Sequence, residues 1–397
     1  MSDFDPSQVV PGELARANAF GPVLEALGEP GSLDLLPTPA LSCEIAGLQR
    51  NIERLQAVAS ARGIRLRPHF KSHKCAFIAQ RQIDAGASGI SCAKLSEAEA
   101  LVGAYEAAGV GAPPILITSP IATRALATRA VDLACSCELS LAIDRLEAVE
   151  EIARAARESD AVVTILCDVN VGLGRTGAAT PEAAVEIAER ASSHRSLRFS
   201  GLQGYAGHSQ HVSPRDERRA SVGSSTRRLS EFVEQLDSSG LSTEVRTGGG
   251  TGSWLMDVDD GVLNELQCGS YLFMDREYRD ALAGDPEDCF EQSLFIVSSV
   301  ISANQPGFVT IDAGLKSMST DAGVASVVGD DGRSFHFFGD EHGMVTNGQG
   351  PPLRVGERVR LVPPHCDPTV NLYDLLWLVE GDRVLGCTPI TARGRSY

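Results

Sequence analysis

Short apolar runs alternate along most of the chain with stretches whose apolar residues recur every three or four positions. The stretch over 46–61 has this spacing at Leu48, Ile52 and Leu55, which predicts an amphipathic helix. The short run over 41–45 before it predicts a strand. Strands that alternate with helices are typical of a parallel sheet joined by crossover helices.

The same alternation continues far along the chain. Further strands are expected over residues 64–67, 89–92, 114–119, 162–168, 197–203, 244–247 and 264–268. Helices are expected over 74–86, from residue 96 onward, over 181–190 and over 216–236. About eight strand–helix units in about 240 residues predict an α/β fold of the (β/α)8 TIM-barrel type.

The pattern changes after about residue 285, where long β-type runs replace the helical spacing. Strands are expected over 293–302, 307–313, 355–362 and 384–387, with turns at 345–348 and 380–383. We therefore expect three parts. They are an N-terminal segment (1–34) that packs on a β domain, a barrel (35–284) and a C-terminal all-β domain (285–397).

The composition narrows the functional class. The chain has 397 residues and a formal net charge of −17, which disfavours nucleic acid or an anionic membrane as a partner. It contains no apolar run of 18 residues that would span a bilayer, and its first residues do not form a secretory signal. Ten cysteines are too sparse for a disulfide scaffold, so we expect a cytoplasmic protein.

The segment 67–74 is the most informative for chemistry. It contains His69, Lys71, His73 and Lys74 directly after a predicted strand, which is where barrel enzymes build their active sites. Crowded cations can lower the pKa of a lysine and make its amine nucleophilic. A solvated basic loop is the alternative interpretation.

A second candidate is the glycine-rich run over 247–253, which also follows a predicted strand. Consecutive glycines let backbone N–H groups approach a phosphate closely. The run has neither the spacing of a dinucleotide fingerprint nor a Walker lysine. It is therefore either an anion site or a flexible turn.

A third candidate is the segment 363–369, in which prolines flank His365, Cys366 and Asp367. In an extended segment, residues 365 and 367 would point the same way and could bind one ion, with Cys366 pointing the opposite way. A nitrogen and oxygen site completed by waters suits Mn²⁺, Mg²⁺ or Zn²⁺. A proline-rich surface turn is the alternative.

Weaker candidates follow other predicted strands. His208 and His211 come after the strand that ends near residue 203, and Arg175 comes after the strand that ends at residue 168. Both positions can reach a barrel mouth. Cys135 and Cys137 suggest a metal site, but no second cysteine pair follows, so we expect buried thiols.

Together the motifs resemble those of the D-threonine aldolase and D-serine dehydratase family, which are fold-type III pyridoxal-phosphate enzymes related to alanine racemase. The resemblance extends from residue 38 to residue 394. The matching motifs are Arg-Pro-His-x-Lys-x-His-Lys at 67–74, Cys-x-Lys-x-Ser-Glu-Ala at 92–98, Gly-Gly-Gly-Thr-Gly-Ser at 248–253, Glu-Leu-Gln-Cys-Gly-Ser-Tyr at 265–271, Asp-Ala-Gly-Leu-Lys-Ser at 312–317, Asp-Glu-His-Gly at 340–343 and Pro-His-Cys-Asp-Pro-Thr at 364–369.

The resemblance implies a pyridoxal 5′-phosphate site. It implies that Lys71, not Lys74, carries the cofactor as a Schiff base, and that Arg175 faces the pyridine nitrogen. Tyr205 and His211 would line the substrate side, with His211 as a catalytic residue. The residues implied to hold the phosphate are Gly249, Gly250, Thr251, Gly252, Ser270 and Tyr271.

The resemblance also implies a divalent metal at His365 and Asp367, with Mn²⁺ preferred and Mg²⁺ or Zn²⁺ as alternatives. Dehydratases of the family show His-x-Cys at the metal and the aldolases show His-x-Asp, so His365-Cys366-Asp367 favours an aldolase. Many relatives have Gln where this chain has Ala93, which leaves the fine substrate preference open.

The implied activity is that of a lyase, namely retro-aldol cleavage of a small D-β-hydroxy-α-amino acid of the D-threonine type to glycine and an aldehyde. The alternatives are cleavage of 3-hydroxy-D-aspartate, and dehydration of D-serine or 3-hydroxyaspartate to a 2-oxo acid and ammonia. Racemisation needs no metal, so the pair His365 and Asp367 argues against it. Related non-catalytic cofactor carriers lack the C-terminal β domain, so the β domain expected over 285–397 argues against that class. Family members are monomers or dimers, so a homodimer is compatible with the resemblance.

Overall fold

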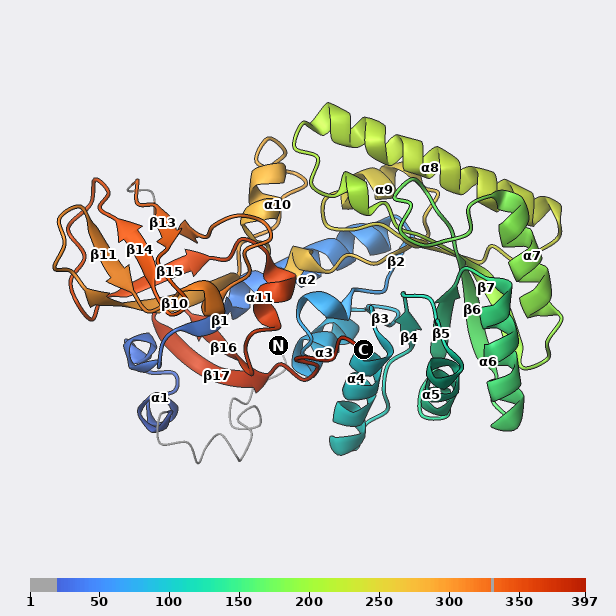
Figure 1. The fold of residues 1–397 in the computed structure, drawn as a ribbon, viewed down its shortest axis with the longest axis horizontal. Helices are drawn as coiled ribbons and strands as arrows, with labels where there is room; N and C mark the ends of the chain where they lie inside the picture. Colours follow the sequence, from blue (N-terminus) through green and yellow to red (C-terminus); the bar gives the residue numbers. More distant parts are fainter. Residues whose placement is uncertain (1–19, 330–331) are drawn as a thin grey trace.

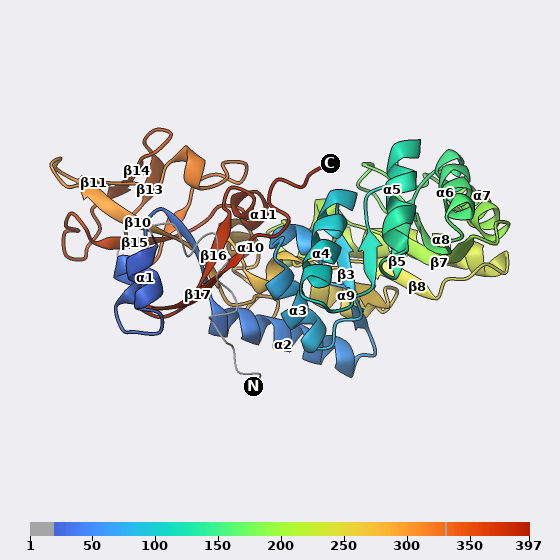
Figure 2. The ribbon, with the colours of Figure 1, turned by 90° about the horizontal axis from the view of Figure 1, so that it is seen from below.

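The computed structural model describes residues 20–329 and 332–397. It contains a barrel lobe and a sheet lobe side by side, with the short helices α10 (Arg276–Ala281) and α11 (Cys366–Val370) between them (Figures 1 and 2). Of the N-terminal segment expected to pack on the β domain, residues 1–19 lie outside the described residues.

The barrel lobe contains eight parallel strands. They are β2 (Arg65–Leu66), β3 (Ile90–Cys92), β4 (Ile115–Ile117), β5 (Leu139–Ile143), β6 (Val163–Asp168), β7 (Leu197–Gly204), β8 (Val245–Gly248) and β9 (Glu265–Leu266). Their order is β2-β9-β8-β7-β6-β5-β4-β3. The two ends meet through a parallel bridge between His69 and Ser91 and a backbone bond from Ser88 N–H to Leu66 O.

Helices cover the outside of these strands (Figure 1). They are α2 (Ile45–Ala61), α3 (Ala76–Asp84), α4 (Leu95–Ala107), α5 (Arg124–Ala134), α6 (Leu146–Glu158), α7 (Pro181–Ser192), α8 (Arg215–Ser238) and α9 (Trp254–Asp260). Helix α6 shows why they form, because Val149, Ile152 and Ala156 are buried at helical spacing and present one apolar face to the strands.

The sheet lobe contains a nine-stranded sheet. Its strands are β1 (Ala40–Glu44), β10 (Leu294–Ser302), β11 (Phe308–Ile311), β12 (Ser326–Val327), β13 (Phe335–Phe337), β14 (Gly343–Thr346), β15 (Arg358–Val362), β16 (Leu375–Glu380) and β17 (Arg383–Pro389). The long strand expected over 293–302 is therefore present as β10. The turn expected over 345–348 is wrong in its first half, because Val345 and Thr346 pair with β11.

The strand expected over 41–45 forms, but it lies in the sheet lobe and not in the barrel. β1 pairs antiparallel with β10 and parallel with β16. An apolar run predicts a strand but carries no information about which sheet accepts it. The eighth barrel strand is instead β5, which the sequence analysis missed.

The described residues before β1 pack on the same sheet. Helix α1 (Gly21–Glu25) and the 3₁₀ turn η3 (Ser32–Leu35) precede it. Val23 and Leu33 are buried against Trp377 and Val384 in a small core of their own. This core lies on β16 and β17, so residues before the barrel help to bury the sheet.

The two lobes confirm the predicted fold class, a (β/α)8-type barrel followed by a C-terminal domain made mostly of strands. Among the described helices, none combines the length and apolarity needed to cross a membrane. The expectation that Cys135 and Cys137 are buried thiols is wrong. Cys135 is exposed and Cys137 is half-buried, because they follow α5 at its surface end.

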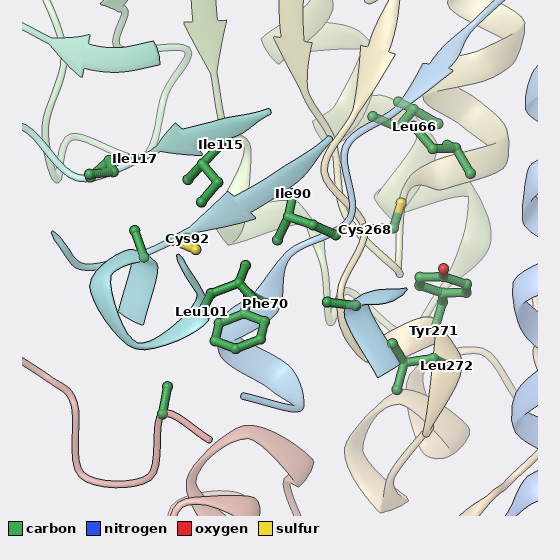
Figure 3. Close-up of a cluster of buried hydrophobic side chains, with 14 of the residues drawn as sticks. Leu66, Phe70, Ile90, Cys92, Leu101, Ile115, Ile117, Cys268, Tyr271 and Leu272 are labelled. Atoms are coloured by element: carbon green, nitrogen blue, oxygen red, sulfur yellow. The ribbon is translucent and has the colours of Figure 1, made fainter. Parts of the chain in front are cut away.

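Buried apolar side chains surround Phe70, the residue that precedes Lys71. Phe70 is fully buried beside Ile90, Cys92 and Leu101, at the ends of β2 and β3 (Figure 3). Burial of a phenylalanine side chain contributes about 1.5–3 kcal/mol. Phe70 therefore anchors the backbone next to Lys71.

Candidate active site

A cavity of about 660 Å³ lies at the carboxyl ends of the barrel strands. Seven of the predicted site residues line it, namely Lys71, Arg175, Tyr205, Gly249, Gly250, Thr251 and Ser270. They follow β2, β6, β7, β8 and β9, so residues far apart in sequence converge as the barrel geometry requires.

Lys71 lies in a 3₁₀ turn, η4 (Phe70–Ser72), directly after β2. Its ammonium group contacts a carboxylate oxygen of Asp367, which belongs to the sheet lobe. Burial opposes the charge on Lys71, but the adjacent Asp367 outweighs it, so the pKa of the lysine is raised. Burial also opposes the charge on Asp367, and Lys71 outweighs that, so the pKa of the carboxyl lies below its usual range.

His365 and Asp367 lie close together but not on an extended segment. The short helix α11 (Cys366–Val370) begins directly after His365, so the alternation expected from an extended chain is wrong. Cys366 is fully buried, and its Sγ faces Oδ1 of Asp367 at 3.3 Å. Asp367 and not Cys366 reaches Lys71.

Two carboxylates that the sequence analysis missed orient this loop. Nδ1 of His365 lies 2.6 Å from Oδ2 of Asp321. The backbone N–H of Cys366 donates to Oδ2 of buried Asp275 at 2.8 Å. These contacts leave Nε2 of His365 as the ring nitrogen available to a metal.

His211 is not among the residues that line the cavity, but it packs against one that is. Its ring packs on Tyr278, with centroids 4.4 Å apart, and Tyr278 lines the cavity. Nδ1 of His211 lies 3.5 Å from Oε1 of Glu277. Burial lowers the pKa of His211, so the imidazole is neutral and can accept a proton at neutral pH. His208 differs, because its Nε2 faces Ser225 of α8 at 3.4 Å.

The glycine-rich loop after β8 has the character of an anion site. Gly249, Gly250 and Thr251 line the cavity, and Oγ1 of Thr251 is buried without a hydrogen-bond partner. An unpaired buried hydroxyl is costly, so such a group indicates a missing partner. Gly252 differs from its neighbours, because its N–H already donates to Oε1 of Gln210 at 2.9 Å.

Arg175 and Tyr205 face one another across the cavity wall. The guanidinium carbon of Arg175 lies 5.5 Å from the centroid of the Tyr205 ring. The neighbouring Thr176 donates to Oδ2 of Asp168 at 2.7 Å, which fixes the loop after β6. Burial raises the pKa of Asp168 to about 6.

Ser270 and Tyr271 point in different directions. Ser270 donates to Oδ1 of Asp367 at 3.3 Å and lines the cavity. The Tyr271 hydroxyl is buried and accepts a hydrogen bond from Nε2 of Gln82 at 3.1 Å. Tyr271 is not among the residues that line the cavity. A side chain that is part of a motif can therefore serve the core.

The sequence analysis missed other cavity-lining side chains, among them Lys94, Thr118, Asp144, Gln203 and Gln267. Each follows or ends a barrel strand. The predicted strand ends could therefore have indicated Thr118, Gln203 and Gln267 without any motif. Asp144 could not be predicted in this way, because the strand that precedes it, β5, was not predicted.

The chain matches two family models in tandem. Residues 44–277 match a model described as alanine racemase, N-terminal domain. Residues 293–379 match a putative serine dehydratase domain. Together with the cavity and its lysine, these matches define a fold-type III pyridoxal-phosphate enzyme with an alanine racemase-like barrel.

The relatives are more specific. The chain is 36% identical to a D-threonine aldolase of Arthrobacter sp., over 97% of this chain and 99% of that protein. It is also 36% identical to a 3-hydroxy-D-aspartate aldolase of Paracoccus denitrificans (strain Pd 1222), over 91% and 93%. A D-threo-3-hydroxyaspartate dehydratase of Delftia sp. (strain HT23) is 28% identical, over 84% and 92%.

A solved structure agrees with these relatives. The D-threonine aldolase from Filomicrobium marinum superposes with a TM-score of 0.88 at 33% identity, over 94% of this chain and 99% of that chain. The chain therefore belongs to the D-threonine aldolase and D-serine dehydratase family, as its motifs indicated. Its nearest named relatives among those above are aldolases, which are lyases.

Proposed function

We propose that this protein cleaves D-β-hydroxy-α-amino acids of the D-threonine type to glycine and an aldehyde. The observation that carries the proposal is the contact between Lys71 of the barrel and Asp367 of the sheet lobe. It supports one reaction centre that combines the lysine implied to carry the cofactor with a residue implied to bind a metal.

The cavity fits pyridoxal phosphate. Thr251 offers an unpaired buried hydroxyl beside Gly249 and Gly250, which suits a phosphate group. Lys71 supplies the amine and Arg175 a positive charge without a carboxylate partner among the described residues. When bound, the cofactor delocalises the negative charge that develops at Cα of the amino acid.

The residues of the chain divide the remaining work between them. His211, held neutral by burial, is suited to accept the proton of the β-hydroxyl as the Cα–Cβ bond breaks. Lys71 is suited to return a proton to Cα, which gives glycine. Buried Tyr278 and half-buried Tyr205 line the cavity and limit the access of water.

His365 and Asp367 would hold the divalent metal. One imidazole and one carboxylate, with waters as the other ligands, suit Mn²⁺, with Mg²⁺ or Zn²⁺ as alternatives. Among the described residues, no group of three His, Cys, Asp or Glu side chains is arranged as a metal site. A metal would lower the pKa of the β-hydroxyl.

Dehydration is the second candidate, because the Delftia relative is named a dehydratase. The side chain that faces Lys71 argues for the aldolase. It is the carboxylate of Asp367, whereas the thiol of Cys366 is fully buried. A carboxylate at this position agrees with the His-x-Asp pattern that the resemblance associates with the aldolases, whereas the dehydratases show His-x-Cys.

The test is a substrate panel with identification of products. The protein with pyridoxal phosphate and Mn²⁺ should convert D-threonine to glycine and acetaldehyde and leave L-threonine unchanged. D-Phenylserine, D-serine and 3-hydroxy-D-aspartate complete the panel, and the last distinguishes the two named aldolase activities. A 2-oxo acid with ammonia as the main product would contradict the proposal.

The setting of the protein is part of the same proposal. All ten cysteines lie in the described residues and are free, which supports a reducing, cytoplasmic compartment. A homodimer is compatible with the family, and sedimentation of the purified protein decides between one copy and two.

A further inference from the structure

A buried glutamine lies directly beneath the glycine-rich loop. Gln210 is 1% exposed and is not among the residues that line the cavity. Its Oε1 accepts the N–H of Gly252 at 2.9 Å. Its Nε2 donates to Oγ of Ser253 at 2.8 Å and to the carbonyl of Ala206 at 3.2 Å. One amide group therefore connects the loop after β8 to the loop after β7.

The network continues below the loop. Ser253 donates to Oδ2 of Asp257 at 2.6 Å, and the backbone of Gly250 also hydrogen-bonds this carboxyl group. Asp257 is 8% exposed, and burial raises its pKa to about 7. The chain Gly252–Gln210–Ser253–Asp257–Gly250 thus fixes both sides of Thr251.

The glycines of the loop are required by this packing. A Cβ atom at Gly250 would lie 2.4 Å from Oε1 of Gln210, and one at Gly252 would lie 1.8 Å from the backbone oxygen of Gln210. Real Cβ atoms do not approach so closely. The two glycines therefore make room for Gln210 beneath the loop, a role distinct from close approach to a ligand above it.

We infer that Gln210 is a positioning residue for the phosphate of the cofactor. It holds the loop so that the unpaired hydroxyl of Thr251 faces the ligand before the ligand arrives. Preorganised donors cost little ordering when they bind an anion. The inference rests on the part of the proposed function that places pyridoxal phosphate in this cavity.

The inference has a specific consequence. Gln210 acts on the phosphate end only, because its contacts are confined to the loops at 206 and 250–253. Its loss should weaken binding of pyridoxal phosphate but not of pyridoxal, which has the same aldehyde and no phosphate. The ratio of the dissociation constant for pyridoxal phosphate to that for pyridoxal therefore isolates the effect of Gln210 on the phosphate.

The experiment uses the full chain freed of cofactor. Imine formation with pyridoxal phosphate and with pyridoxal is titrated by absorbance for the wild type and for Gln210→Met, which has a similar volume and no amide. We expect the dissociation constant for pyridoxal phosphate to rise by about tenfold or more, as when an outer-shell partner is removed. That for pyridoxal should change less than about twofold.

A matched control and a milder variant complete the test. Gln292→Met removes an amide that also holds backbone carbonyls, those of Phe273, Met274 and Leu294, but that touches no part of the loop. It should leave the ratio unchanged. Ser253→Ala removes only the next hydrogen bond of the network and should raise the ratio by a smaller factor, which keeps the test valid if Gln210→Met does not fold.

Several outcomes would overturn the inference. One is an equal loss of affinity for both ligands, which would indicate general disruption of the cavity. Another is an unchanged ratio in Gln210→Met and Ser253→Ala. If neither ligand forms an imine with the wild type, the proposed cofactor itself fails, and that result is distinct from a failure of Gln210.

Discussion

The two ends of the cavity are built from different physical interactions. At the end proposed to bind the phosphate, the loop over 249–253 is held by hydrogen bonds through Gln210 and carries the buried, unpaired hydroxyl of Thr251. At the other end Lys71 lines the cavity, and charges from both lobes converge next to it, with Lys71 on Asp367 and His365 on Asp321. Neither His365 nor Asp367 is among the lining residues. One end is prepared by a hydrogen-bonded loop and the other by paired charges, so the first should govern affinity for the cofactor and the second turnover.

The largest expected effect is that of Lys71→Ala, which removes the amine shared by binding and catalysis. The holoenzyme should lose its imine absorbance, and cleavage of D-threonine should fall to background. Spectra and product assays check both. Lys74→Ala is not a neutral control, because buried Lys74 forms an ion pair with buried Glu97. The control is Lys316→Ala, which changes an exposed lysine of the sheet lobe. An imine that survived in Lys71→Ala would reassign the lysine.

Asp367→Ala should separate the two ends most clearly. The imine should persist, because the phosphate end is intact, while kcat should fall on the order of 10³-fold, since a metal contributes several kcal/mol of charge stabilisation. Isothermal titration with Mn²⁺ should show lost binding. Full activity of Asp367→Ala in the presence of a chelator would exclude the metal role.

His211→Gln should reduce kcat by about hundredfold, within the range for loss of a general base. Burial lowers the pKa of His211, so the neutral form persists to a pH below the usual histidine value of about 6.5. Activity should therefore be lost only as the pH falls through this lowered pKa. His211→Gln should remove that acidic limb from the profile of kcat against pH. A limb that remained unchanged in the variant would belong to another group.

Thr251→Val should have the smallest effect and the opposite pattern. Loss of one hydrogen bond to a charged group should raise the dissociation constant of pyridoxal phosphate by about tenfold, with kcat at saturating cofactor unchanged. Fluorescence titration measures the affinity. Thr243→Val, at a half-buried threonine that donates to Asp237, serves as the control. A loss of kcat without a change in affinity would contradict the division between the two ends.

The acid stability of the cofactor-free protein follows from the same charges. The folded-state pKa of Asp367 is lowered, so its contribution to stability is present above the unfolded carboxyl pKa of about 3.9 and is lost as the pH falls through the folded value. Asp367→Asn should flatten the dependence of the melting temperature on pH at the acidic end. An identical dependence would show that Lys71 does not stabilise the carboxylate.

The sequence predicts the barrel well because its evidence is local. Helical spacing and apolar runs give α2, α7 and α8 within a few residues. Which sheet receives β1 depends on partners more than 250 residues away, Ile296 and Phe295 in β10. No periodicity contains that information.

The candidate site also contains residues that local sequence patterns indicate and residues that depend on contacts between distant segments. Motifs indicate Lys71, the glycine-rich loop and His365-Cys366-Asp367 directly. The cavity brings Lys71 and residues 249–251 together, and Asp367 contacts Lys71. Gln210, Asp275 and Asp321 were missed because their roles arise from contacts with other segments. A single Gln or Asp has no spacing to recognise, and only folding places it beneath a loop or beside an imidazole.

The central claim is that the lysine and the metal ligands serve one reacting molecule. Pyridoxal phosphate labelled with ¹³C at C4′ and bound to Lys71 tests it by nuclear magnetic resonance with and without Mn²⁺. The account predicts strong paramagnetic broadening of the C4′ signal in the wild type and little in Asp367→Ala. A C4′ signal that stayed sharp in wild-type protein saturated with Mn²⁺ would contradict it.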